Sequence, residues 1–235
     1  MIVSANLKTN LTRKQTKEYI SALGEYVSQN NITQDVLVFP AVSSLDNHNT
    51  TLVVGTQNAY ATKNGAYTGE IGLEHLEEFE ISTILIGHSE RRHILGETQK
   101  MVAEKFKFYQ DLGFKIVYCV GEPLEIKEAG EDKMMEYISA QYEGIDTDYE
   151  NLIIAYEPVW AIGTGLTPTI EDIKNTHAKL KQKSKAPLLY GGSVKVGNIK
   201  DIIVCDGVDG VLVGSAALDV DDFCTMCQIA QDMEK

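Results

Sequence analysis

Eight short apolar segments recur along the chain, separated by stretches with the apolar spacing of helices. Most of the short segments are continuous runs of Val, Ile and Leu, without a strict alternation of apolar and polar residues. Continuous runs of this length are typical of parallel strands that are covered on both faces. The predicted strands are residues 2–6, 36–39, 52–55, 83–86, 115–120, 152–156, 187–190 and 210–213.

The stretches between these segments fit amphipathic helices. In the first of them, residues 12–29, Thr12 and Gln15 form a capping-box pattern, and Ile20 and Leu23 belong to an apolar stripe at helical spacing. Further helices are predicted at residues 97–112, 132–142, 169–183, 198–204 and 219–232, with shorter ones at 42–48 and 73–79.

The number of strands favours a closed sheet. Each unit of strand and helix takes about 29 of the 235 residues, which suits parallel strands joined by helical crossovers. Closure removes the unpaired edges that an open sheet of this size would have to protect. No linker rich in Pro, Gly or Ser divides the chain. The sequence therefore predicts one (β/α)8 barrel domain over residues 1–235.

Composition narrows the range of partners. A net charge of −13 without a run of Lys or Arg excludes a nucleic-acid partner, because binding to phosphate backbones depends on clustered basic side chains. No apolar run approaches the roughly 20 residues of a membrane helix, so no membrane partner is expected. The first residues lack the pattern of a secretory signal, and a cytoplasmic location is expected. The four cysteines show no disulfide or zinc spacing, and Cys224 and Cys227 are interpreted as apolar positions on a helix face.

Polar residues that end apolar strands are the candidates for chemistry, because barrels of this kind place their sites at the C-terminal ends of the strands. Side chains alternate between the two faces of a strand. This alternation groups Ser4 with Asn6 and Lys8, Ile84 and Ile86 with His88, and Ile153 and Ala155 with Glu157. We therefore expect Asn6, Lys8, His88 and Glu157 to meet at one mouth of the barrel.

Glu157 closes an apolar strand, where a carboxylate is costly unless it is paired or used. One interpretation is a structural ion pair. The other is a general base whose pKa is raised by apolar neighbours, with Ile162 and Leu212 as its walls.

His88 permits three interpretations: a core histidine with its hydrogen bonds satisfied, a metal ligand with Glu90 and His93, or a hydrogen-bond donor. The spacing of these three residues matches no zinc pattern, so no metal is expected. If a helical turn starts at Ser89, its N–H groups would favour a neutral imidazole. A neutral imidazole can donate a hydrogen bond without protonating its target.

Lys8 and the glycine-rich loops complete the candidate site. Lys8 is interpreted as a surface lysine, a fixed positive charge or a Schiff-base nucleophile. Three backbone stretches could present N–H groups to an anion: Gly163 and Gly165 in the sixth loop, Gly191-Gly192-Ser193 after the seventh strand and Gly214-Ser215 after the eighth. The loops after the seventh and eighth strands are where such barrels commonly bind phosphate.

Six motifs, in order along nearly the whole chain, resemble the triosephosphate isomerase family. They are Asn6-x-Lys8, residues 87–92 (GHSERR), 118–122 (YCVGE), 155–165 (AYEPVWAIGTG), 190–193 (YGGS) and 212–215 (LVGS). The resemblance implies a TIM barrel that interconverts dihydroxyacetone phosphate and glyceraldehyde 3-phosphate, a step of glycolysis and gluconeogenesis, with no cofactor and no metal.

The resemblance also implies residue roles. Glu157 would move a proton between the two carbons of the substrate. His88 would polarise the carbonyl and shuttle protons between the two oxygens. Lys8 and Asn6 would stabilise the enediolate, and Glu90 would hydrogen-bond within this set. Gly163, Ser193, Gly214 and Ser215 would hold the phosphate, and closure of residues 158–167 would press Ile162 and Leu212 against Glu157.

Residues 58–70 resemble the loop through which members of the family form homodimers. Tyr67 and Thr68 lie in it, and the residue matching Thr68 reaches the active site of the partner subunit. Two departures concern function. Leu166 replaces the usual Lys after the mobile loop, and Ser215 replaces a glycine of the last phosphate loop. Two alternatives to the isomerase stay open: a phosphosugar lyase or aldolase with Lys8 as a Schiff base, and a non-catalytic barrel that binds a triose phosphate.

Overall fold

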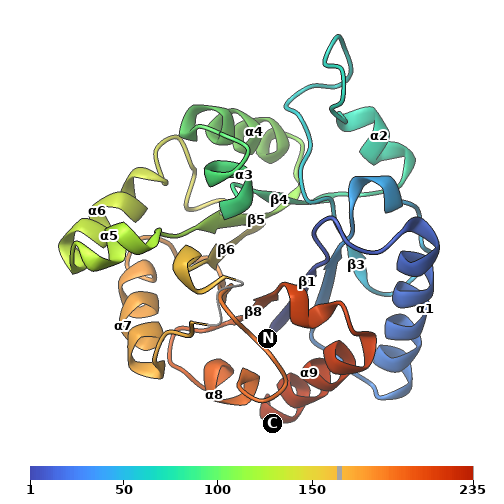
Figure 1. The fold of residues 1–235 in the computed structure, drawn as a ribbon. Helices are drawn as coiled ribbons and strands as arrows, with labels where there is room; N and C mark the ends of the chain where they lie inside the picture. The colour runs from blue at the N-terminus through green and yellow to red at the C-terminus, as the bar shows by residue number, and fades with distance from the viewer. Residues whose placement is uncertain (163–165, 235) are drawn as a thin grey trace.

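A parallel barrel surrounded by helices forms the molecule (Figure 1). The structure is a computed structural model, and it describes residues 1–162 and 166–234. Five of the predicted strands have the observed bounds, and the other three differ by one residue at one or both ends. The strands are β1 Ile2–Asn6, β2 Asp35–Phe39, β3 Val53–Val54, β4 Thr83–Ile86, β5 Lys115–Val120, β6 Leu152–Tyr156, β7 Leu188–Tyr190 and β8 Gly210–Val213.

Hydrogen bonds join the strands in the order β3-β2-β1-β8-β7-β6-β5-β4, and the paired strands run parallel. An isolated parallel bridge between Thr56 and Ile84 connects the two ends of this sheet. There Thr56 N donates to Thr83 O and Leu85 N donates to Thr56 O, each at 2.9 Å. The bridge closes the barrel, and the predicted fold class is confirmed.

Helices cover the outside of the barrel (Figure 1). The capping box of α1 is confirmed, because Thr12 accepts from Gln15 N and the Gln15 side chain accepts from Thr12 N. The helices are α1 Arg13–Gln29, α2 Leu73–Glu78, α3 Ser89–His93, α4 Gln99–Asp111, α5 Leu124–Glu128, α6 Glu131–Ala140, α7 Ile170–Leu180, α8 Ile199–Ile203 and α9 Val220–Met233, with 3-10 turns η1 Val42–Ser44, η2 Val159–Ala161 and η3 Ser215–Ala217.

The helix predicted at residues 42–48 is wrong. Only the turn η1 forms there, because Leu45 is extended (ψ 134°) and Asn49 takes a positive φ of 47°. Helix α5 was not predicted, since five residues are too few to show a helical period. The helical turn expected at Ser89 is confirmed as α3.

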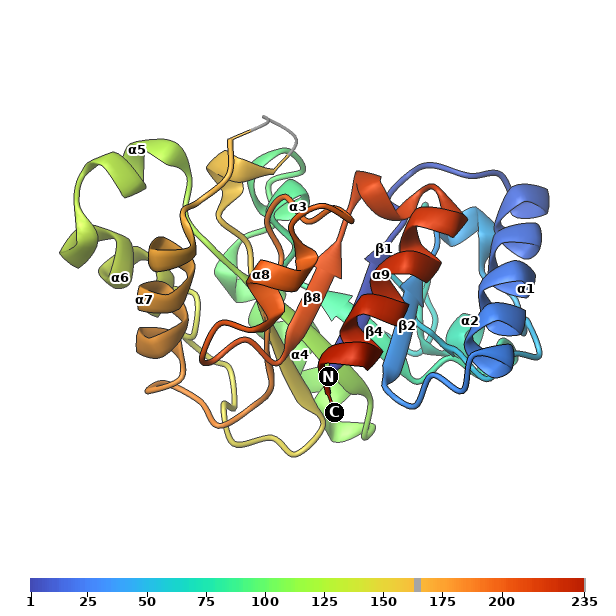
Figure 2. The ribbon, with the colours of Figure 1, turned by 90° about the horizontal axis from the view of Figure 1, so that it is seen from below.

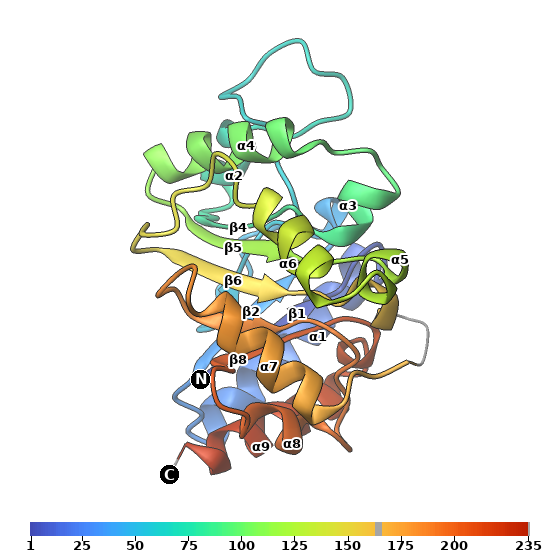
Figure 3. The ribbon, with the colours of Figure 1, turned by 90° about the vertical axis from the view of Figure 1, so that its left-hand side faces the viewer.

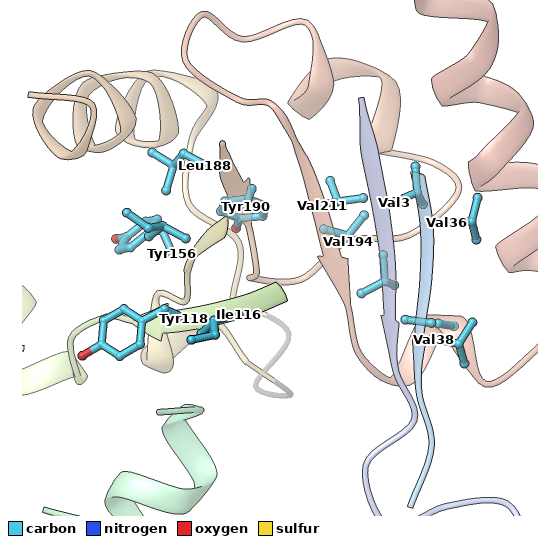
Figure 4. Close-up of a cluster of buried hydrophobic side chains, with 14 of the residues drawn as sticks. Val3, Val36, Val38, Ile116, Tyr118, Tyr156, Leu188, Tyr190, Val194 and Val211 are labelled. Atoms are coloured by element: carbon cyan, nitrogen blue, oxygen red, sulfur yellow. The ribbon is translucent and has the colours of Figure 1, made fainter. Parts of the chain in front are cut away.

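The core has two layers. The larger lies between the barrel and its helices, and Figure 4 shows part of it, with Val3, Val38 and Tyr156 packed outside the strands. The smaller fills the barrel itself. Its buried members are Leu37, Phe39, Leu85, Val117, Cys119, Ile153, Ala155, Leu189 and Leu212.

The two layers test the predicted grouping of side chains. Ile153 and Ala155 lie in the inner layer, so Glu157 continues the inner face of β6 as expected. The grouping for β4 is wrong, because Ile84 and Ile86 lie in the outer layer and Leu85 in the inner one. Gly87 follows with a φ of +77°, a value that side-chain-bearing residues rarely adopt. This turn, and not strand alternation, brings His88 to the mouth of the barrel.

The two chain ends lie together at the end of the barrel opposite α3 (Figure 2). The Met1 ammonium forms an ion pair with Glu234 there. The C-terminal ends of the strands open at the other end, where the predicted site residues gather.

Candidate active site

A cavity of about 390 Å³ opens at the C-terminal ends of the strands. It holds residues from loops that are far apart in the sequence, and its size falls in the range of small-molecule sites. Its lining includes Asn6, Lys8, His88, Glu157, Ile162, Thr167, Ser193, Lys195, Leu212, Gly214 and Ser215.

Glu157 lies directly after β6 and is 2% exposed. Its Oε1 is 2.9 Å from His88 Nε2, and its Oε2 accepts from Ser89 N at 3.0 Å. Gly191 lies against the side chain, since a Cβ added there would be 3.0 Å from Glu157 Cγ. Two hydrogen-bond donors therefore fix Glu157, and neither is a Lys or Arg side chain.

The raised pKa expected for Glu157 is wrong. Burial raises the pKa of Glu157, but the charge and hydrogen bond of His88 and the N–H of Ser89 outweigh it, and the net direction is downward. The prediction considered the apolar walls and omitted the two donors. Leu212, 3% exposed, and Ile162 do line the cavity together with Glu157.

His88 is the N-cap residue of α3, and its Nδ1 accepts from Glu90 N at 3.2 Å. Burial lowers the pKa of His88, whereas the charge and hydrogen bond of Glu157 raise it, and the net direction is upward. A second proton would have to bind Nδ1, whose lone pair is already engaged by an N–H group. The geometry therefore fits a neutral ring with its proton on Nε2, donated to Glu157.

Lys8 and Asn6 form the cationic side of the cavity. Lys8 Nζ is 2.6 Å from Glu90 Oε1, so the expected hydrogen bond of Glu90 within this set is present. Lys8 N donates to Asn6 Oδ1 at 3.0 Å, which leaves the NH₂ of Asn6 as the donor it can offer to the cavity. A Cβ added to Gly214 would lie 3.7 Å from Lys8 Nζ, so the ammonium lies beside the loop after β8.

The loops after β7 and β8 supply the expected anion side. Ser193 Oγ donates to Ala161 O at 2.7 Å, and Asn198 Nδ2 donates to Ser193 O at 3.0 Å, which together fix the first loop. Ser215 begins η3, and the first N–H groups of such a turn have no partner within it. Gly163 lies outside the described residues, so its predicted role is not addressed by the structure.

Tyr67 and Thr68 do not line this cavity. They lie in the loop of residues 58–72, which projects beyond the barrel (Figure 3). The rings of Tyr60 and Tyr67 pack with centroids 4.4 Å apart, and Tyr67 remains 45% exposed. Within one chain, Tyr67 and Thr68 thus lie away from the candidate site, whereas Gly69, Glu70 and Ile71 of the same loop line a neighbouring cavity.

Within the described ranges 1–162 and 166–234, no group of three His, Cys, Asp or Glu side chains is arranged to hold a metal ion. In the same ranges, no helix has both the length and the apolar character required to cross a membrane. The sequence did not predict the Ser89 N–H as a contact of Glu157. The helix start predicted at Ser89 was the signal that could have identified it.

Comparison with known proteins agrees with this geometry. The family model described as Triosephosphate isomerase matches residues 1–230. A curated protein named triosephosphate isomerase from Sulfurimonas denitrificans is 67% identical over 235 residues, covering 100% of this chain and 98% of the relative. Proteins of the same name from a Sulfurovum species (55% identical, 96% and 99% covered) and Wolinella succinogenes (51% identical, 97% and 99% covered) also match. The chain belongs to the triosephosphate isomerase family of enzymes.

Proposed function

We propose that this chain, as a single barrel domain over residues 1–235, interconverts dihydroxyacetone phosphate and glyceraldehyde 3-phosphate. The observation that carries the proposal is the convergence of a buried carboxylate, a buried imidazole and an ammonium on one cavity beside two N–H-rich loops. A three-carbon phosphate needs this combination: a base for its C–H bond, donors for its oxygens and an anion site for its phosphate.

Glu157 removes a proton from the carbon beside the carbonyl, which leaves an enediolate, and returns the proton to the neighbouring carbon. His88 donates from Nε2 to the developing oxyanion and carries a proton from one substrate oxygen to the other, while Lys8 and the NH₂ of Asn6 stabilise the negative charge of the enediolate. Ser193, Gly214 and Ser215 bind the phosphate, and Gly163 completes this set. Glu157 accepts hydrogen bonds from His88 and Ser89, and substrate oxygens take over the His88 donor and so release the base.

The contacts of Lys8 argue against a lyase or aldolase. A Schiff-base lysine is activated in an apolar pocket or beside another cation. Lys8 is instead ion-paired with Glu90 at 2.6 Å. Borohydride reduction in the presence of dihydroxyacetone phosphate should leave Lys8 unlabelled, and covalent labelling at Lys8 would favour the lyase.

A non-catalytic binding module would need the phosphate loops alone. Such a module would not need the carboxylate of Glu157, which is 2% exposed and hydrogen-bonded to His88 beside the cavity. Exchange of carbon-bound hydrogen with deuterium from solvent separates the two functions, because only the isomerase exchanges hydrogen during turnover. A coupled assay of triose-phosphate interconversion is the direct test, and absence of activity in the correctly folded protein would refute the proposal.

We also propose that two copies of the chain form a homodimer. A second cavity of about 540 Å³ adjoins the first and shares Asn6, Lys8 and His88 with it. Two exposed apolar residues, Val42 (57%) and Leu95 (64%), line this second cavity. The projecting loop with Thr68 and Tyr67 on the partner subunit supplies a shape that can fill it. Light scattering should give twice the mass of one chain, and a monomer at assay concentration would contradict the proposal.

We propose a cytoplasmic location for this enzyme.

A further inference from the structure

The turn η3 after β8 is short and depends on contacts from outside it. Two backbone hydrogen bonds close the turn, from Ala217 N to Gly214 O at 2.9 Å and from Leu218 N to Ser215 O at 3.2 Å. Hydrogen bonds of 3-10 geometry are less well aligned than those of an α-helix, so a turn of this length is not rigid by itself. Its first residue lines the cavity, and the position of the turn therefore decides where its N–H groups point.

A tyrosine of the first helix binds the far end of this turn. The hydroxyl of Tyr19, on α1, donates to Ala217 O at 2.7 Å, across 198 positions of the sequence. Tyr19 is 5% exposed and Ala217 is fully buried. Burial raises the pKa of the Tyr19 hydroxyl, so it remains protonated and able to donate near neutral pH. A buried carbonyl that loses such a donor is costly to leave unpaired.

Neither packing nor contact with a substrate explains the hydroxyl of Tyr19. Tyr19 and Ala217 both belong to the outer core layer, where an apolar side chain could fill the same space. Tyr19 is absent from the lining of the cavity that holds Glu157. Ser215 and Ala216, directly before Ala217, do line it. The hydrogen bond therefore connects α1 to the turn on the anion side of the cavity.

We propose that Tyr19 is a positioning residue whose hydroxyl holds η3, so that the N–H groups of Gly214 and Ser215 face the phosphate of the substrate. The inference rests on the proposed isomerase function. Without the hydroxyl, the Ala217 carbonyl must turn toward another donor, and the backbone of η3 moves with it. Hydrogen bonds weaken steeply as their angles depart from the preferred range, so phosphate binding weakens while Glu157 and His88 stay in place.

The test compares Tyr19→Phe with wild type on two substrates, glyceraldehyde 3-phosphate and glyceraldehyde, which lacks the phosphate. The variant removes the hydroxyl and keeps the ring. We expect kcat/KM for glyceraldehyde 3-phosphate to fall about threefold to tenfold, mainly through KM, because bound substrate and transition state lose the same contacts. For glyceraldehyde, followed by NMR, kcat/KM should change by less than about twofold. Tyr19→Leu also lacks the hydroxyl and should give the same difference between the substrates if the phenylalanine variant does not fold.

Tyr149→Phe is the matched control. Tyr149 OH donates to Phe114 O at 2.8 Å, directly before β5 at the opposite end of the barrel. This control should lower the midpoint of thermal unfolding and leave kcat/KM for both substrates within about twofold of wild type. Equal losses of Tyr19→Phe on the two substrates, or no loss on either, would overturn the proposal.

Binding of inorganic phosphate separates this inference from the isomerase function. Calorimetry should give a Kd about threefold to tenfold higher for Tyr19→Phe than for wild type, and an unchanged Kd for Tyr149→Phe. This measurement needs no turnover, so it tests the role of Tyr19 even if the wild-type chain does not interconvert triose phosphates. An unchanged Kd in Tyr19→Phe would show that the hydroxyl does not position the phosphate loop.

Discussion

Two buried histidines show how their partners determine what an imidazole can do. His88 lies at the mouth of the barrel, with Nδ1 on the N–H of Glu90 and Nε2 on Glu157. His177, on α7, lies outside the barrel wall, with Nδ1 3.1 Å from Gly207 O and with no hydrogen-bond partner for Nε2 in the described parts of the chain. Both rings are almost inaccessible to solvent, so burial alone does not distinguish them.

The difference lies in the charge around each ring. His177 packs between Tyr156 and Tyr190, with ring centroids 5.9 and 6.2 Å away. Burial lowers the pKa of His177 to about 4, and only the hydrogen bond to Gly207 and the charge of Asp209 oppose this. His88 has the Glu157 carboxylate beside it, which moves its pKa in the opposite direction. A buried histidine becomes available for proton chemistry when a titratable partner and a cavity accompany it.

The largest effect on kcat should come from removing the negative charge of Glu157, the partner of His88. Glu157→Gln keeps the size of the side chain but lacks a base, so kcat should fall by about 10² to 10⁴. The affinity for substrate analogues should remain largely unchanged. Steady-state kinetics measure this, and a kcat within threefold of wild type would remove Glu157 from its role. The same variant should lower the pKa of His88, as followed by NMR, because the charge that raises it is gone.

Removing the imidazole of His88 should lower kcat by somewhat less. His88→Ala deletes one donor to the oxyanion, and the expected loss in kcat is about 10² to 10³. Circular dichroism must show a folded protein for the comparison to count. His177→Gln serves as the control, because it changes an equally buried histidine that does not line the cavity. Equal losses in the two variants would show that the contrast between the histidines has no catalytic meaning.

His177 should instead appear in the pH dependence of stability. The unfolded chain takes up a proton on this histidine near its ordinary pKa of 6.5, whereas the folded chain does so only near 4. Stability therefore falls as the pH drops from about 6.5 to about 4, by about 3 kcal/mol from this group.

The measurement is chemical denaturation at fixed protein concentration across this pH range. His177→Gln should flatten the decline, whatever its effect at neutral pH. Parallel curves for wild type and variant would contradict the assignment.

The comparison of His88 with His177 also indicates which features of the structure the sequence could predict. Continuous apolar runs identified the strands, because burial on both faces leaves few alternatives for such segments. The positions of Glu157 and Asn6 followed from alternation along β6 and β1. His88 was expected in the right place for the wrong reason, since Gly87 reverses the face that alternation predicts.

The missed features depend on contacts between distant segments. The downward pKa of Glu157 comes from donors on α3, and the hydrogen bond of Tyr19 reaches Ala217, 198 positions away in the sequence. Neither contact has a local pattern. His177 likewise gave no signal, because its environment is made by β6, β7 and the loop at Gly207.

The smallest expected effect is that of salt on kcat/KM. Salt should act on the solvent-facing active site and not on the buried His177. The chain carries a net charge of −13, which repels a dianionic substrate at long range. Lys8 and Lys195 line the cavity and give it a local positive field. We expect the local field to dominate, so that kcat/KM falls about twofold to fivefold between about 0.01 and 0.2 M ionic strength.

Lys195→Gln makes this prediction sharper, because Lys195 is exposed at the rim and is absent from the contacts of Glu157 and His88. Its loss should reduce the salt dependence of kcat/KM and leave kcat near that of wild type. The part of the pH-dependent stability assigned to His177 should not respond to salt, because that ring is fully buried. A kcat/KM that rises with added salt would mean that the overall negative charge, and not the cavity, governs the approach of the substrate.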